Sequence, residues 1–115
     1  MKTYDQLQVI EFLSRADSYG AGVDDVKKIE THISVVFLAG KRAFKLKRAV
    51  KYPYLDFSTL ELRHNTCMAE ISVNRRTAPG LYKGVVALTA DESGALSIGG
   101  EGEVVEWLVE MARFN

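Results

Sequence analysis

Hydrophobic and polar residues recur with two periods along this chain, and the periods separate expected helices from expected strands. Apolar residues return at helical spacing over residues 4–17 and 60–76, so we expect one helix in each segment. Residues 3–6 form a plausible capping box, and at residues 58–61 Ser58 is positioned to cap the second helix. The buried stripe of that second helix is predicted to consist of Leu60, His64, Cys67, Met68 and Ile71.

The strand-like segments alternate or are continuously apolar. Residues 33–38 are almost all apolar, which indicates a strand covered on both faces. Over residues 43–50 the alternation places Phe44 and Leu46 on one face and Lys45 and Lys47 on the other. Further strands are predicted at residues 26–30, 81–89, 95–98 and 104–111. The pattern predicts an α+β fold, an antiparallel sheet of five or six strands with one or two packed helices.

Composition narrows the possible partners and the compartment. A chain of 115 residues is long enough for a single domain, here residues 1–115 with the sheet and its packed helix over 26–111. Its 15 basic and 15 acidic residues cancel, so charge gives no reason to expect a nucleic acid or an anionic membrane as partner. A single cysteine and no long apolar segment indicate a cytoplasmic protein without disulfides, signal peptide or membrane span.

Lys45 is the first candidate for chemistry. A strand lysine that faces a packed helix is able to place its ammonium group against phosphate oxygens, and the small Ala43 leaves room beside it for a base. The alternative is a solvated strand lysine, the commoner situation for this residue type. Lys47 lies on the same face and is a rival for the same role.

Glu70 is the second candidate, at the edge of the apolar stripe of the second helix. A carboxylate there is able to reach a lysine of the sheet, orient it and keep it charged. The alternative is a surface glutamate whose neighbours at helical spacing are Arg63 and Asn74.

Three other groups are weaker candidates. The loop at 31–34 offers the hydroxyls of Thr31 and Ser34 to a ligand, although it has no glycine-rich signature. His64 and Cys67 lie three residues apart but have too few partners for a metal site, so we interpret both as core residues. The aromatic residues within 52–57 form either a stacking platform or core beneath a loop.

The residues considered together resemble the aminoglycoside-phosphotransferase-like family, which has a protein-kinase-like fold. The similar segments are residues 31–34, 36–40, 43–48, 54–61, 74–79, 84–86 and 104–114. The nearest type is the bacterial two-domain protein in which the kinase-like domain precedes a P-loop ATP-binding domain. The resemblance implies a kinase-like N-terminal lobe that binds ATP, with Lys45 on the phosphates and Glu70 as its helix partner. It also implies nucleotide contacts from a strand entering the hinge beside adenine and from earlier strands, through Thr31, Ser34, Ala43, Glu106 and Val109.

The sequence departs from that family by what it lacks. It contains no HGD-like or DFG-like stretch and no GxxxxGK[ST] motif, so we assign no catalytic residue and no metal ligand to it. We therefore expect a truncated or isolated N-lobe without its C-lobe, inactive as a kinase by itself. Binding of Mg-ATP is expected to be weak and unnecessary for folding.

The competing interpretation is a non-catalytic interaction module. A lone N-lobe would expose the face that meets the C-lobe, near Trp107, Met111 and Phe114. An exposed apolar face favours self-association or a docked partner. This interpretation predicts a homodimer, or a complex with a separate C-lobe or P-loop domain.

Overall fold

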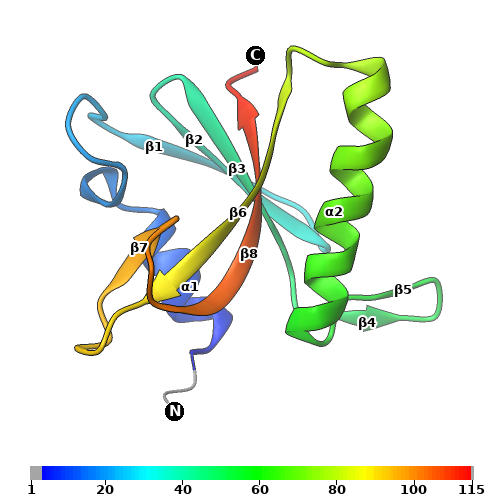
Figure 1. The fold of residues 1–115 in the computed structure, drawn as a ribbon, viewed down its shortest axis with the longest axis horizontal. Coiled ribbons are helices and arrows are strands. Elements are labelled where there is room, and N and C mark those ends of the chain that lie inside the picture. Colours follow the sequence, from blue (N-terminus) through cyan, green and yellow to red (C-terminus); the bar gives the residue numbers. More distant parts are fainter. Residues whose placement is uncertain (1–3, 115) are drawn as a thin grey trace.

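The computed structural model describes residues 4–114 and shows an α+β domain built on one antiparallel sheet of six strands (Figure 1). The strands follow the spatial order β1-β2-β3-β8-β6-β7. Their bounds are β1 Val26–Glu30, β2 Ser34–Ala39, β3 Arg42–Lys47, β6 Tyr82–Ala90, β7 Leu96–Ile98 and β8 Glu103–Ala112. The predicted α+β class and antiparallel sheet are confirmed, and each predicted sheet strand is present with boundaries shifted by a few residues.

The two helices cover opposite faces of this sheet. Helix α1 (Gln6–Leu13) supplies Val9 and Leu13 to a core that contains Phe44 and Leu46 of β3. Helix α2 (Leu60–Thr77) packs Cys67 and other residues against the opposite face, over Ala43 and Val109. The predicted alternation in β3 is therefore confirmed. Strand β2 has buried residues on both faces, as its apolar sequence predicted, because each helix covers one of them.

The helix starts differ from those predicted. Asp5 caps α1 and forms a capping box with Gln8, while the predicted cap Thr3 lies outside the described residues. Thr59 caps α2, since its hydroxyl accepts from the Leu62 N–H at 3.1 Å, whereas the Ser58 hydroxyl donates to Asp56 Oδ1 at 2.6 Å. The first helix is also shorter than expected. It ends at Leu13 and is followed by a 3₁₀ turn over Ala16–Tyr19.

The predicted buried stripe of α2 is partly wrong. Met68 is 53% exposed, and Arg63 is buried on the packed face of α2 instead. The aromatic segment before α2 contains a small hairpin formed by β4 (Lys51–Tyr52) and β5 (Leu55–Asp56). Tyr52 and Tyr54 stack on each other at this hairpin, with a ring-centroid distance of 5.6 Å.

The expected exposed patch near the C-terminal strand is not present as predicted. Met111 is only 2% exposed and belongs to the core beneath α2, whereas Phe114 is 38% exposed. Trp107 is half-buried, and its ring stacks on the His64 ring with a centroid distance of 3.9 Å. The three residues therefore do not form one exposed surface. Among residues 4–114, no helix is both long and apolar enough to cross a membrane.

Candidate functional site: a carboxylate between two lysines

Glu70 of α2 binds two lysines of β3, one with each carboxylate oxygen. Lys45 Nζ lies 2.8 Å from Glu70 Oε2, and Lys47 Nζ donates to Glu70 Oε1. The three side chains are largely enclosed, with exposed fractions of 23% for Lys45, 8% for Lys47 and 12% for Glu70. The structure therefore brings together both candidate residues and the rival lysine in one centre.

The local structure explains this arrangement. Lys45 and Lys47 are two residues apart on a strand, so their side chains leave the same face, which is the face covered by α2. Glu70 lies one residue before Ile71 and three after Cys67, and both of these pack against the sheet. Glu70 is thus held at the edge of the packed stripe, within reach of β3.

The environment of Glu70 favours its ionised form. Burial alone would raise the pKa of this carboxyl group, but hydrogen bonds from Lys45 and Lys47, together with their positive charges, outweigh burial and lower it. Two ammonium groups then face one carboxylate, which leaves one positive charge in excess. A centre with this charge is suited to an anion that reaches its more exposed side, at Lys45.

Ala43 and Val109 lie beside Lys45 on the sheet and are fully buried in the core under α2. Val109 is the register partner of Lys45 on β8. Both positions are on the same sheet face as the two lysines, but their side chains are in contact with protein.

Thr31 and Ser34 form the tight turn between β1 and β2, at the end of the sheet where Lys47 pairs with Ser34. The Thr31 hydroxyl accepts hydrogen bonds from the backbone N–H of Ile33 at 3.3 Å and of Ser34 at 3.0 Å. Arg48 reinforces the turn by donating to the Thr31 carbonyl at 2.7 Å. Thr31 and His32 are exposed, Ser34 is half-buried, and these bonds fix the shape of the turn.

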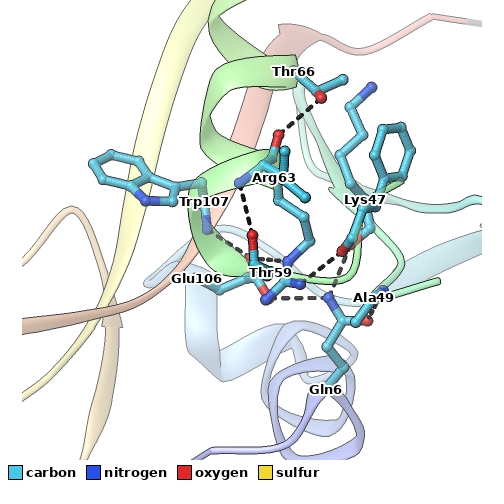
Figure 2. Close-up of polar contacts among 10 residues, drawn as sticks. Gln6, Lys47, Ala49, Thr59, Arg63, Thr66, Glu106 and Trp107 are labelled. Atoms are coloured by element: carbon cyan, nitrogen blue, oxygen red, sulfur yellow. Dashed lines mark hydrogen bonds and ion pairs between the residues drawn. The ribbon is translucent and has the colours of Figure 1, made fainter. Parts of the chain in front are cut away.

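Glu106 belongs to a different, buried network rather than to an open site (Figure 2). Its Oε1 accepts from Arg63 Nε at 3.0 Å and from the Trp107 backbone N–H at 3.1 Å. Its Oε2 accepts from Gln6 Nε2 at 3.0 Å, and Gln6 also donates to the Lys47 carbonyl at 2.9 Å. The network joins α1, α2, β8 and the end of β3, immediately beside the lysine centre.

Sequence reasoning missed this network although two signals were present. Arg63 lies three residues after Leu60 and four before Cys67, which places a charged residue on the packed face of α2. Glu106 interrupts an otherwise apolar run over residues 104–109. A buried cation and a buried anion on adjacent elements are expected to pair, because neither is stable alone in a core.

His64 and Cys67 both pack against other residues of the protein. The His64 ring packs on Trp107, and burial raises the pKa of the Cys67 thiol to about 11. Within residues 4–114 there is no cluster of three or more histidine, cysteine or carboxylate side chains able to hold a metal ion. A cavity of about 390 Å³ lies elsewhere, against α1, and is lined by Tyr4, Gln8, Glu11, Phe12, Arg15, Gly94, Ala95 and Leu96.

Comparison with known proteins gives relatives but no activity. Uncharacterized proteins of Mycobacterium bovis and Mycobacterium tuberculosis are each 46% identical to the chain over 65 residues. The match covers 56% of the chain and only 13% of each relative, so the relatives are much longer proteins. No family model matches the sequence, and no solved structure matches the chain.

Proposed function

We propose that this domain positions the phosphates of ATP through Lys45, as the nucleotide-holding lobe of a small-molecule phosphotransferase. The observation that carries the proposal is the 2.8 Å contact between Lys45 of a sheet strand and Glu70 of the packed helix. A lysine oriented in this way by a helix glutamate is how kinase-like folds hold nucleotide phosphates.

The state of Lys45 suits that role. Glu70 fixes one of its three ammonium donors and leaves the other two for an incoming oxyanion. Its side chain is 23% exposed, so a ligand is able to reach it without opening the core. The excess positive charge of the centre adds an electrostatic attraction for phosphate.

The other candidate residues have supporting parts in this proposal. The turn that holds Thr31 and Ser34 would lie over the phosphates, with the hydroxyl groups of these two residues as the candidate donors. Ala43 and Val109 would support the sheet beside Lys45, since both are buried. Glu106 would act on the site indirectly, because its oxygens already accept hydrogen bonds from protein donors.

The full reaction needs more than this segment supplies. Phosphoryl transfer requires a metal ion on the β- and γ-phosphates and a positioned nucleophile, and we assign neither to residues 4–114. In our proposal Mg²⁺ arrives with the nucleotide, and acceptor and catalytic groups belong to other parts of the phosphotransferase. The acceptor would be the alcohol of a small molecule.

The test is an amide NMR titration of the ¹⁵N-labelled domain with Mg-ATP. We expect shift changes at residues 31–34, 43–47 and 106–111, and their loss in Lys45→Met. Lys27→Met is the matched control, because Lys27 is an exposed lysine of strand β1. This variant should bind Mg-ATP like the wild type. Unchanged affinity in Lys45→Met, or no response in the wild type, would overturn the assignment.

A flat titration would favour the second candidate, a non-catalytic interaction module. Light scattering over a range of protein concentrations would then show whether the domain forms a homodimer. The exposed apolar residues Met68 and Val73 lie on α2 and provide the surface to mutate in that case.

A further inference from the structure

Lys47 contributes only its charge to the function proposed above, yet it is the more enclosed of the two lysines. Its side chain is 8% exposed, against 23% for Lys45, although both bind the same carboxylate. The Lys47 ammonium also lies 5.8 Å from the centroid of the Phe57 ring, a cation–π contact that holds it in place. One lysine of the centre is therefore accessible and the other is fixed.

Phosphate binding by Lys45 creates a problem that this difference solves. When phosphate binds the two free donors of Lys45, the ammonium group shares its positive charge between two anions, and its bond to Glu70 weakens. Glu70 is 12% exposed, and a largely buried carboxylate without a cationic partner is strongly destabilising. A second cationic partner on Glu70 keeps the carboxylate compensated while phosphate binds to Lys45.

We propose that Lys47 is the positioning residue of this centre: it keeps Glu70 ionised and in place, so that Glu70 still orients Lys45 when Lys45 binds phosphate. The inference rests on the proposed function, since it names the device by which the same site accepts a nucleotide. Lys47 touches no phosphate and acts only through Glu70.

The surrounding charges agree with this assignment. The neighbouring carboxylate, Glu106 on β8, is neutralised by Arg63 on α2. The Arg63 Nε lies 3.0 Å from Glu106 Oε1. Cys67, one turn before Glu70, stays a neutral thiol because burial raises its pKa. The excess positive charge of Lys45, Lys47 and Glu70 therefore remains available to an anion.

The first experiment needs no nucleotide. Carboxyl ¹³C NMR would follow the titration of Glu70 in the wild type and in Lys45→Met, Lys47→Met and Lys47→Arg. We expect the Glu70 pKa to rise further in Lys47→Met than in Lys45→Met, because the charge lost is the less solvated one, and Lys47→Arg to restore it. An equal or larger rise in Lys45→Met would overturn the proposal.

The second experiment adds Mg-ATP and observes the lysine Nζ signals. We expect the Lys45 signal to move while the Lys47 and Glu70 signals stay, and about tenfold weaker binding in Lys47→Met, close to 1.4 kcal/mol. Lys47→Arg should restore affinity, and Lys27→Met should leave it unchanged. A Lys47 signal that moves as far as that of Lys45 would make Lys47 a direct phosphate ligand and overturn the inference.

Failure of the two proposals is distinguishable. If the wild type does not bind Mg-ATP but the Glu70 titrations follow the expected order, the nucleotide function is wrong and the hold of Lys47 on Glu70 stands. Thermal unfolding would confirm that each variant is folded. Lys47→Gln, which removes the charge but keeps a hydrogen-bond donor, replaces Lys47→Met if that variant does not fold.

Discussion

Arg63 and Glu106 form an ion pair that is almost completely excluded from solvent, with Nε and Oε1 3.0 Å apart. Their side chains are 9% and 1% exposed. Arg63 also donates to the Phe57 carbonyl at 2.9 Å, so the pair ties α2 to β8 and to the segment that precedes the helix. The same segment carries the Phe57 ring that contacts the Lys47 ammonium. The ion pair therefore also helps to hold Lys47 in place.

Removing one member of this pair should destabilise the domain strongly. Arg63→Met leaves the Glu106 carboxylate buried without its cation, which typically costs about 3–5 kcal/mol of unfolding free energy. Urea denaturation followed by circular dichroism measures the loss. Adding Glu106→Leu to Arg63→Met should cost less than the sum of the single variants, since no uncompensated charge remains.

Arg42→Met is the control for that experiment. Arg42 and Glu110 also form a 3.0 Å pair between neighbouring strands, but their side chains are 46% and 25% exposed. Water screens such a pair, so its removal should cost only about 0–1 kcal/mol. A comparable loss in Arg42→Met and Arg63→Met would contradict the role given to burial.

Gln6 should matter for stability more than its place at the start of a helix indicates. Its amide donates to the Lys47 carbonyl and to Glu106 Oε2, and its oxygen accepts from the Ala49 N–H at 2.7 Å. Gln6→Ala should therefore cost roughly 1–3 kcal/mol, the range for leaving enclosed polar groups without partners. Gln8→Ala, which removes only an exposed capping bond, should cost about 0.5–1 kcal/mol, and equal losses in urea denaturation would argue against the network.

The sequence contained enough to predict the sheet and the two helices and to make Lys45 and Glu70 candidates for a pair, although not to show that they touch. Strand alternation placed Lys45 on a definite face, and helical spacing placed Glu70 at the edge of the packed stripe, so both constraints were local. The burial of Met111 and exposure of Met68 could not be predicted in this way. They depend on where α2 crosses the sheet, which is decided by the packing of Cys67 and Ile71 against residues distant in sequence.

The Arg63–Glu106–Gln6 network was unpredictable for a related reason. Each member comes from a different element, and Gln6 and Glu106 are 100 residues apart in the chain. Local patterns say which face a residue occupies but not which distant residue faces it. Nucleotide binding by the lysine centre also stays a prediction, because it depends on a ligand and not on the fold alone.

Glu70 should make the domain sensitive to acid. Its pKa is lowered in the folded state: burial raises it, but the hydrogen bonds and charges of Lys45 and Lys47 lower it more. A depressed carboxyl pKa contributes stability that is full above the unfolded value of 4.5 and is lost as the pH falls through the folded value. Unfolding free energy measured by urea at decreasing pH should therefore fall less steeply in Glu70→Gln than in the wild type.

Glu61→Gln is the matched control for the acid experiment. Glu61 lies in the first turn of the same helix and is exposed. Its substitution should leave the slope of stability against pH close to that of the wild type. If Glu70→Gln and Glu61→Gln had the same slope, the two lysines would not be what holds the Glu70 carboxylate in its charged form.

Cys67 should be nearly inert toward thiol reagents in the folded protein. Burial raises the pKa of its thiol to about 11, so at a pH near 8 only about one thiol in a thousand is the reactive thiolate. The side chain is also 0% exposed, which blocks a disulfide reagent sterically. We expect labelling by an aromatic disulfide reagent to be slow in buffer and to accelerate through the urea unfolding transition, because reaction requires the unfolded chain. Labelling in buffer as fast as in urea would show that α2 separates from the sheet without global unfolding, and the lysine centre, held together by that same packing, would then open as well.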